Sequence, residues 1–220
     1  MVILGYSLIA VVAYLLGSIP TGFLVAKARG IDIRTVGSGN IGATNVFRYL
    51  GKPAGIFVLL ADALKGWLAV AVVTKLISEW FYPAANQQAQ ECFQITAGVC
   101  AILGHNYTCW LHFKGGKGIA TSAGVLIALV PWPLAIILTV WIIVFVLSRY
   151  VSLASIAAAI TLPFAVWLTK QSLTLVIVTA AMGALAIYKH KANIIRLING
   201  TENRIGSKKE PLAGAGKQTL

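Results

Sequence analysis

The sequence predicts an all-α membrane protein, a polytopic bundle of transmembrane helices. Of the 220 residues, 58% are hydrophobic and only 11% are charged. A water-soluble domain of this length cannot bury that much apolar surface. Several apolar stretches also approach or exceed the roughly 20 residues that carry a helix across the hydrocarbon core of a bilayer. The bilayer is therefore the expected solvent for most of the chain.

Seven apolar stretches divide the chain, and each predicts a helix. Their ranges are 2–26, 54–78, 93–110, 119–131, 133–148, 152–168 and 172–188. The first has no basic residue before it and is longer than the apolar part of a signal peptide, so we expect it to be retained. The fourth is short, and the turn Pro131-Trp132-Pro133 forces a break after it. Five spans result instead if 119–148 forms one long, kinked helix and 152–188 another.

The basic residues predict the orientation of the bundle, because they outnumber the acidic ones by 18 to 6. With seven spans and the N-terminus outside, most of them fall on one side, in residues 27–53, 111–118, 149–151 and 189–220. Lysine and arginine accumulate in cytoplasmic loops, so we expect the C-terminus in the cytoplasm. Five spans give the same orientation, and Arg149 in a short turn favours seven. The net charge of +12 is explained in this way without a nucleic-acid partner.

The remaining composition limits the domain count and the chemistry. We expect one transmembrane domain over residues 1–206 and a flexible cytoplasmic tail over residues 207–220. Cys92, Cys100 and Cys109 have the spacing of neither a metal site nor a disulfide framework. No carboxylate pair suggests a glycosidase, and the GxSxG motif of a hydrolase nucleophile is absent. We expect no metal and no other cofactor.

The stretch "RTVGSGNIGATNVFR", residues 34–48, is the first of three unusual segments on the predicted cytoplasmic side. Its glycines let the backbone approach a ligand and turn its amides toward an anion. Its polar side chains add hydrogen bonds, a hydroxyl and a cation. The candidate site residues are Gly37, Ser38, Gly39, Asn40, Thr44, Asn45 and Arg48. A flexible turn that caps the next helix is the alternative, but it needs fewer residues of this kind.

The second segment, "GHNYTCWLHFKGGKGIATSAG", covers residues 104–124. A glycine-rich turn that leads into a helix favours phosphate binding, because free amides and the positive end of the helix dipole face the ligand. The segment is not a Walker A loop, and a basic hairpin that only follows membrane topology is the alternative. The candidate binding residues are His105, Asn106, Gly115, Gly116, Lys117, Gly118 and Thr121.

The third segment, "YKHKANIIRLINGTENRIG", covers residues 188–206. His190, Asn193 and Arg196 follow one another at intervals of three, so they share a helix face if the last span continues. A basic helix that rests on anionic lipid is the alternative. That alternative explains the lysines, but it does not require His190, Asn193 or Glu202.

Asp62 and Lys65 place two charges inside the second apolar stretch, three positions apart. Charges within a span are costly, and they usually pair and face the bundle interior or a wet cavity. A structural ion pair and a role of Lys65 in binding both fit this pattern. We assign Asp62 to structure and Lys65 to the candidate site as a further cation.

These segments together resemble one family closely. "GSGNIGATNVFR", "GHNYTCWLHFKGGKGIAT" and "HKANIIRLINGTENRIG", with "LLGSIPTGFLVAK" and "DALKG", are similar to motifs of the bacterial membrane acyltransferase that uses acyl-phosphate and glycerol 3-phosphate. The resemblance covers about residues 5 to 206. It implies formation of lysophosphatidic acid and phosphate, the first acylation of phospholipid synthesis, without acyl-CoA or acyl carrier protein as donor. The HxxxxD motif of other glycerolipid acyltransferases has no counterpart after His105, His112 or His190.

The resemblance also implies roles for individual residues. Ser38 and Arg48 correspond to the essential serine and arginine of the first motif. Gly115, Gly116 and Gly118 correspond to the glycerol phosphate loop, with Lys117 as its cation. The histidine and asparagine of the third motif are His190 and Asn193, and its glutamate, Glu202, is assigned to structure. The implied protein is a multi-pass protein of the bacterial cytoplasmic (inner) membrane whose active site faces the cytoplasm. We expect it to be a monomer.

Two other functions fit parts of the sequence. A transporter of an organic phosphate also needs cations within a membrane bundle, but its binding residues should lie near the midplane and not at one face. A protein that only binds anionic lipid needs basic juxtamembrane segments. For such a protein, Ser38 would have no role.

Overall fold

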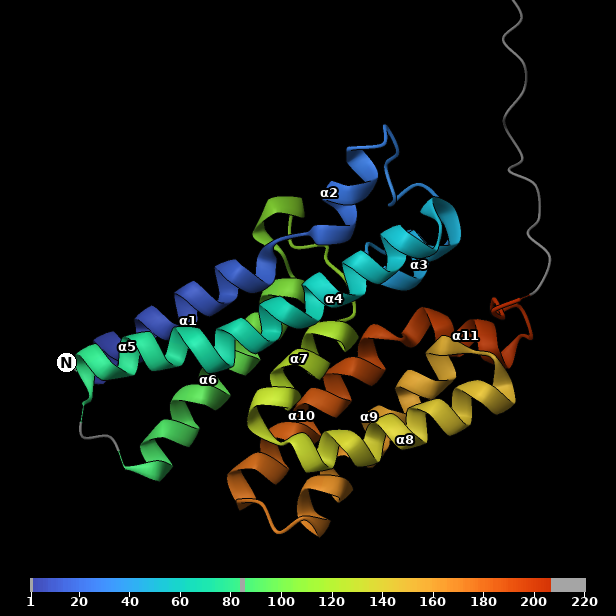
Figure 1. Cartoon of the computed structure of the whole chain (residues 1–220). Helices are drawn as coiled ribbons and strands as arrows, with labels where there is room; N and C mark the ends of the chain where they lie inside the picture. The colour runs from blue at the N-terminus through green and yellow to red at the C-terminus, as the bar shows by residue number, and fades with distance from the viewer. Residues whose placement is uncertain (1, 84–85, 207–220) are drawn as a thin grey trace, which may run out of the picture.

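The computed structural model describes residues 2–83 and 86–206, and all regular structure within them is helical (Figure 1). The predicted tail, residues 207–220, lies outside the described residues. The helices are α1 (Val2–Ser18), α2 (Thr21–Lys27), α3 (Ala43–Leu50), α4 (Lys52–Leu68), a π-helical turn (Ala69–Val73), α5 (Thr74–Phe81), α6 (Gln87–Asn106), a 3₁₀ turn (Cys109–Leu111), α7 (Ile119–Leu129), α8 (Pro131–Ser148), α9 (Val151–Leu168), α10 (Leu173–Lys189) and α11 (Lys191–Ile198).

Each of the seven predicted stretches contains a helix, and the breaks between them have local causes. Val130, whose φ of −146° and ψ of 72° are not helical, ends α7 before Pro131 begins α8. A turn at 169–172 separates α9 from α10. Neither long helix of the five-span alternative is therefore formed. α6, which corresponds to the predicted stretch 93–110, begins earlier than predicted, at Gln87. Asn86 caps it there by accepting a hydrogen bond from the amide of Ala89.

Four helical runs in the described residues are long and apolar enough to cross a membrane, judged by length and composition. They are Val2–Lys27, Lys52–Phe81, Pro131–Ser148 and Val151–Leu168. A fifth is obtained if α10 and α11 count as one span despite the 57° bend between them. α7 has 11 residues and is roughly 16 Å long, too short to cross the hydrocarbon core alone. Seven full spans therefore stay a prediction.

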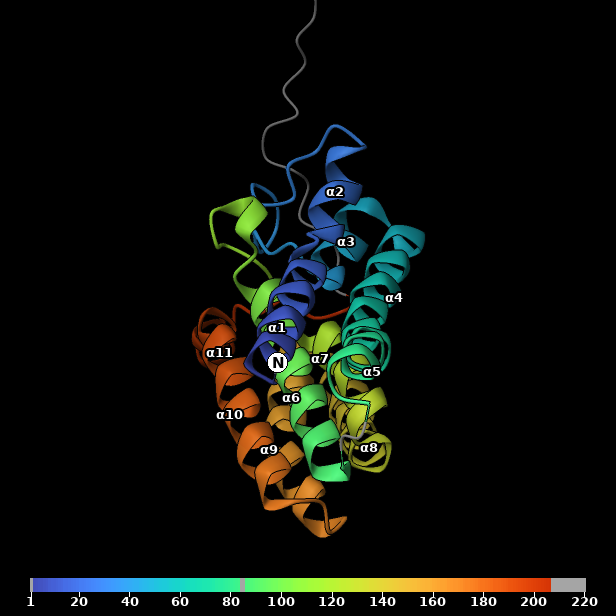
Figure 2. The ribbon, with the colours of Figure 1, turned by 90° about the vertical axis from the view of Figure 1, so that its left-hand side faces the viewer.

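The basic segments meet at one end of the bundle. α1 packs along α6, α4 packs along α7, and α9 lies between α8 and α10 (Figures 1 and 2). At the end where α2, α3 and α11 lie, the amide of Ile205 donates to the carbonyl of Arg149 (3.0 Å), and the guanidinium of Arg48 donates to the carbonyl of Asn203 (3.1 Å). Segments that the charge pattern assigned to one side are thus in direct contact.

Small residues allow the helices that carry these segments to approach closely. The Cα of Gly124 in α7 lies against the backbone of α4, where an added Cβ would be 1.8 Å from the carbonyl oxygen of Ala63. Gly66 in α4 faces α7 in the same way, with Thr121 as its neighbour. Such contacts let dispersion forces stabilise helix pairs in lipid, where apolar burial provides little drive for association.

We predict that Gly124→Ala lowers the melting temperature of the detergent-solubilised protein by about 5 °C, because the new methyl group forces α4 and α7 apart. Gly5→Ala is the matched control, since Gly5 lies inside α1 and an added Cβ meets nothing closer than Phe81 at 3.4 Å. Thermal unfolding followed by fluorescence or circular dichroism measures both. Equal melting temperatures for the two variants would contradict close packing at Gly124.

Candidate functional site

A cavity of about 550 Å³ lies between α3, α4, α7, α8, α9 and α10. One end is polar and lies among the basic segments, and the rest is an apolar arm. The polar lining residues are Ser38, Asn40, Thr44, Asn45, Arg48, Asp62, His105, Lys117, Ser122, Ser152, Ser155, His190, Asn193 and Glu202. The larger apolar lining residues are Ile56, Leu59, Leu126, Leu134, Ile137, Leu138, Trp141, Phe145, Leu162 and Met182. The cavity thus joins polar groups to an apolar channel, and all of its lining comes from one chain.

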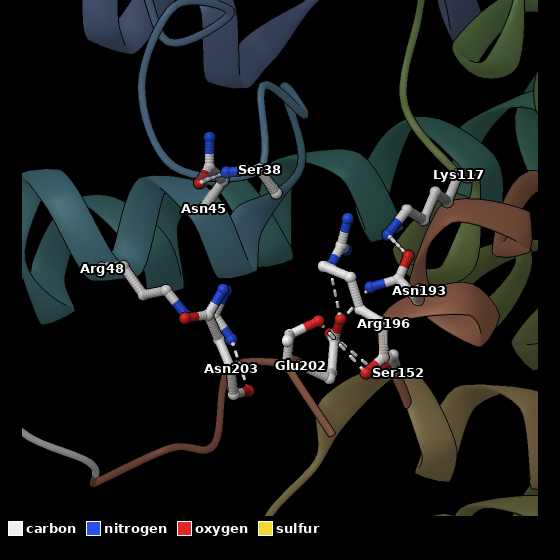
Figure 3. A network of polar contacts seen from close by, with 10 residues as sticks. Ser38, Asn45, Arg48, Lys117, Ser152, Asn193, Arg196, Glu202 and Asn203 are labelled. Atoms are coloured by element: carbon white, nitrogen blue, oxygen red, sulfur yellow. Dashed lines mark hydrogen bonds and ion pairs between the residues drawn. The ribbon is translucent and has the colours of Figure 1, made fainter. Parts of the chain in front are cut away.

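Asn45 organises the glycine-rich loop before α3. Its amide nitrogen donates to the carbonyls of Ile33, Val36 and Asn40 at 3.0–3.2 Å, and its oxygen accepts from the amide of Ser38 at 3.2 Å. The side chain is buried, so these bonds replace those that water would make. Ser38 is held at the cavity as a result (Figure 3). Asn45 was a candidate ligand residue, but these hydrogen bonds all go to the loop.

The glycine loop before α7 is attached to the end of α6. The amides of Gly115 and Gly116 donate to the carbonyls of Asn106 (3.2 Å) and His105 (3.0 Å), which are free because α6 ends there. Gly118 has φ +80°, a conformation that favours glycine, and α7 begins after it. Lys117 projects from this loop into the cavity, and its Nζ donates to Oδ1 of Asn193 at 2.5 Å (Figure 3).

Glu202 is the centre of the polar network in Figure 3. Its Oε1 accepts from the amide nitrogen of Asn193 (2.8 Å) and from the hydroxyl of Ser152 (2.9 Å), and its Oε2 accepts from Nε of Arg196 (2.7 Å). Burial by itself would raise the pKa of Glu202, but the three hydrogen bonds outweigh it and leave the pKa below the ordinary value. Glu202 is therefore ionised at neutral pH and links α9 to α11.

The positive charge of the cavity depends on pH through Lys117. Burial lowers its pKa to about 8; Glu202 opposes the shift, and the positive charges of Arg196, Arg48 and Lys189 add to it. Lys117 is thus charged at neutral pH and becomes neutral as the pH rises through about 8. An anion in the cavity would relieve the repulsion among these cations, so the polar end is suited to bind a phosphate or a similar group.

His190 presents one ring nitrogen to the cavity. Its Nδ1 lies 2.7 Å from the carbonyl oxygen of Ala186, so Nδ1 carries the proton that makes this hydrogen bond. The side chain is buried at the end of α10, and the residue lines the cavity. Nε2 is then the nitrogen available to a ligand. No carboxylate is hydrogen-bonded to His190 in the part of the chain that the structure describes.

The cavity brings together most of the predicted site residues. They include the five expected to be catalytic, which are Ser38, Arg48, Lys117, His190 and Asn193. Those that do not line it are Gly37, Gly39, Lys65, Asn106, Gly115, Gly116, Thr121 and Arg196. Several of these residues hold lining residues or loops in place. Gly115 and Gly116 donate hydrogen bonds to carbonyls of α6, and Arg196 donates one to Glu202. The predictions that they contact a ligand stay predictions.

Three contributions to the site have no signal of their own in the sequence. Ser152 begins α9 and resembles any other hydroxyl near a helix start, and Asn203 acts through its backbone carbonyl, which every residue has. The apolar arm was also missed, since its leucines and Trp141 resemble ordinary lipid-facing residues. In the structure, the indole of Trp141 donates to the hydroxyl of Ser155 at 3.2 Å, a contact that the sequence does not reveal.

The chain is similar to proteins of one kind. A family model described as glycerol-3-phosphate acyltransferase matches residues 7–200. The glycerol-3-phosphate acyltransferase of Geotalea daltonii is 48% identical over 191 residues, which cover 87% of this chain and 93% of the relative. That of Clostridioides difficile is 46% identical over 211 residues, which cover 96% of this chain and 100% of the relative.

Two solved structures have the same fold. Both are crystal structures of PlsY (YgiH), described as an integral membrane glycerol 3-phosphate acyltransferase. The glycerol 3-phosphate form has a TM-score of 0.80 and 39% identity, covering 91% of this chain and 96% of that chain. The lysophosphatidic acid form has a TM-score of 0.77 and 38% identity, covering 91% of this chain and 95% of that chain.

We predict that the affinity of the cavity for sulfate, an anion whose charge is constant from pH 6.5 to 9.5, falls as the pH rises through about 8. The reason is that Lys117 loses its charge there. Isothermal titration calorimetry at several pH values measures this. Lys117→Arg should keep binding at high pH, because a guanidinium stays charged. Lys114→Ala, in the same loop but outside the cavity, is the control and should keep the wild-type profile. An unchanged profile in Lys117→Arg would contradict the assignment.

Proposed function

Because this chain belongs to the glycerol-3-phosphate acyltransferase family, we propose that it moves a fatty acyl group from acyl-phosphate to the 1-hydroxyl of glycerol 3-phosphate. The products are lysophosphatidic acid (1-acyl-glycerol 3-phosphate) and inorganic phosphate, and the reaction is the first acylation of phospholipid biosynthesis. One observation carries the proposal: a single cavity joins a cationic, amide-lined end to an apolar arm. That shape matches a single-chain lipid with a phosphate head.

The polar end supplies groups for phosphate. Lys117 and Arg48 line it, and so does Ser38, which belongs to the glycine-rich loop before α3. Both cations are partly occupied without a substrate: Lys117 binds Asn193, and Arg48 binds the carbonyl of Asn203. These neutral partners are weaker acceptors than a phosphate, so a substrate can displace them and gain charge-assisted hydrogen bonds. The acyltransfer needs two phosphate groups in one place, and two cations on opposite walls suit that requirement.

The apolar arm suits the acyl chain. Its lining includes Phe145 and Trp141 of α8, together with Leu126, Ile137 and Leu162, which belong to a packed core cluster. Phe145 and Leu134 are eleven positions apart on α8, so the arm is roughly 16 Å long. Residues on its rim are about half exposed, with Leu59 in α4 at 47% and Leu138 in α8 at 50%. A chain can therefore enter from the bilayer between α4 and α8.

The proposed reaction requires no covalent enzyme intermediate. Acyl-phosphate is a mixed anhydride and is already activated. The oxygen of the glycerol 1-hydroxyl attacks the acyl carbonyl carbon, the bond from that carbon to the phosphate oxygen breaks, and phosphate leaves. Lys117, Arg48 and the loop amides stabilise the charge and hold both substrates close to each other. Ser38 binds and orients a substrate and is not a nucleophile.

Two groups can take the proton of the attacking hydroxyl. One is Nε2 of His190, which lines the cavity. The other is a phosphate oxygen of the donor. No carboxylate orients His190 in the described residues, unlike the usual arrangement for a histidine base, and this supports transfer to the donor.

The location and assembly are also proposals. The end with the cavity carries the basic loops, which supports a site that faces the cytoplasm across a bacterial cytoplasmic (inner) membrane, with the N-terminus outside. We also propose that the protein acts as a monomer. The polar residues gather at one end of the bundle, which disfavours a transporter with a midplane site. No cofactor enters the proposed reaction.

Purified protein in detergent, given palmitoyl-phosphate and glycerol 3-phosphate, should form lysophosphatidic acid. Palmitoyl-CoA in place of the donor should give none, because the polar end is built for a compact phosphate. Ser38→Ala and Lys117→Ala should each reduce the rate by about 10²-fold while the protein still folds. Mass spectrometry of lysophosphatidic acid measures the product with each donor and in each variant. Equal use of palmitoyl-CoA, or an acyl-Ser38 species trapped during turnover, would overturn the corresponding part of the proposal.

Ala158→Phe should slow transfer from palmitoyl-phosphate about 30-fold and leave transfer from butyryl-phosphate nearly unchanged. Ala158 lines the apolar arm, and a phenyl ring there displaces several methylene groups of a long chain. Ala157→Phe is the matched control, because Ala157 is the neighbouring alanine of α9 and does not line the cavity. Parallel loss of both donors in Ala158→Phe would place the acyl chain elsewhere.

A further inference from the structure

A buried ionic cluster lies behind the polar end of the cavity, where α2, α4 and α6 meet. It consists of Asp62 and Lys65 of α4, Thr21 of α2 and His105 of α6. Asp62 is 2% exposed, Lys65 4% and His105 5%. Buried charges of this kind are costly, and a well-packed apolar group could replace them without loss of stability. Their presence points to a requirement other than stability alone.

A single carboxylate oxygen connects the members of this cluster. Oδ1 of Asp62 accepts from Nζ of Lys65 at 2.8 Å and from the hydroxyl of Thr21 at 3.1 Å, and Nδ1 of His105 lies 3.7 Å from it. Lys65 also donates to the carbonyl of Ile19 at 2.8 Å, in the break between α1 and α2. The distance to His105 is too long for a hydrogen bond, and Nδ1 has no other hydrogen-bond partner among the described residues. Asp62 and His105 therefore interact by packing and electrostatics, and this contact places the imidazole beside α4.

His105 in turn supports the loop that carries Lys117. Its carbonyl accepts from the amide of Gly116, and the next carbonyl, of Asn106, accepts from Gly115. The other side of the imidazole packs on the same loop, because a Cβ added to Gly116 would lie 2.1 Å from Nε2 of His105. Any displacement of the ring therefore moves the residue directly before Lys117.

We propose that Asp62 and His105 are positioning residues for the reaction: they set the depth of the loop Lys114–Gly118 and thereby place Nζ of Lys117 at the phosphate end of the cavity. The path runs from Asp62 Oδ1 to the imidazole of His105, from the imidazole to Gly116, and from Gly116 to Lys117. This assignment rests on the proposed function for its kinetic consequences. Its structural consequence, the position of a cation, does not depend on the identity of the acyl donor.

The assignment differs from the expectation that His105 binds substrate directly. His105 does line the cavity, but its Nδ1 lies nearest Asp62 and its Nε2 lies against Gly116. Asp62 has its Oδ1 engaged by Thr21 and Lys65. Both residues therefore act through the loop, and Lys65 acts as the counter-ion that keeps the buried cluster neutral.

The test uses Asp62→Asn, which keeps the shape of the side chain, and His105→Phe, which keeps a ring without its nitrogens. Each variant should raise the KM for glycerol 3-phosphate about tenfold or more, because a small displacement of Lys117 is sufficient for that. Each should change the KM for palmitoyl-phosphate less. His105→Asn, which retains a nitrogen near Asp62, should restore part of the loss.

Sulfate titration separates positioning from a merely structural role. If Lys117 leaves its buried place, the pH at which sulfate affinity falls should move upward from about 8 in both variants. Thr179→Val is the matched control, since Thr179 is buried in α10 and its hydroxyl bonds only to carbonyls of its own helix. It should lower the melting temperature without changing the sulfate profile.

The outcomes are distinguishable. Sulfate binding requires no turnover, so it tests the positioning role even if acyl-phosphate is not the donor. If Asp62→Asn and His105→Phe do not fold, Gly116→Ala replaces them, because its methyl group displaces the His105 ring and leaves Asp62, Lys65 and Thr21 unchanged. An unchanged sulfate profile and an unchanged KM in folded variants would overturn the proposal.

Discussion

The polar end of the cavity depends on compensation of the repulsion between several cations that lie close together at the boundary of an apolar bundle. Lys117, Arg48 and Arg196 repel one another, and burial adds to the cost of Lys117. Glu202 offsets this from one side: it holds Arg196 directly and Lys117 through Asn193. On the other side, Asp62 neutralises Lys65 beneath the glycine loop. The two carboxylates lower the electrostatic cost of these cations in the folded protein. A phosphate can then replace the neutral acceptors that the cations bind.

The same arrangement explains why so many segments converge on the end of α6. The last carbonyls of that helix accept from Gly115 and Gly116, and the carbonyl of Asn106 also accepts from Nζ of Lys189 at 3.1 Å. Lys189 precedes His190, so one helix end locates both the glycine loop and the histidine. Helix ends have free carbonyls in any protein. Here glycine makes them accessible, since a side chain at 115 would collide with the backbone of α6, where an added Cβ lies 2.0 Å from the carbonyl oxygen of His105.

Polar and apolar parts of the cavity have different origins. The polar end is built from loops and helix ends, where backbone amides and carbonyls are available. The apolar arm is built from the middles of α4, α7, α8 and α9, where the bundle leaves a space that its own side chains do not fill. A lipid substrate with a charged head requires both, and the boundary between them coincides with the place where helices end.

The sequence by itself determined that the chain is a helical membrane protein, which end carries the basic loops, and which short segments hold the candidate site residues. These features follow from local composition: apolar length, charge bias and glycine-rich motifs are readable without contacts. Only the tertiary structure decided that Asn45 serves its own loop, that Glu202 reaches Lys117 through Asn193, and that Arg48 meets the carbonyl of Asn203. Lys117 and Asn193 are 76 positions apart, and Arg48 and Asn203 are 155 apart. No local pattern records such pairs, because they arise only when packing brings distant helix ends together.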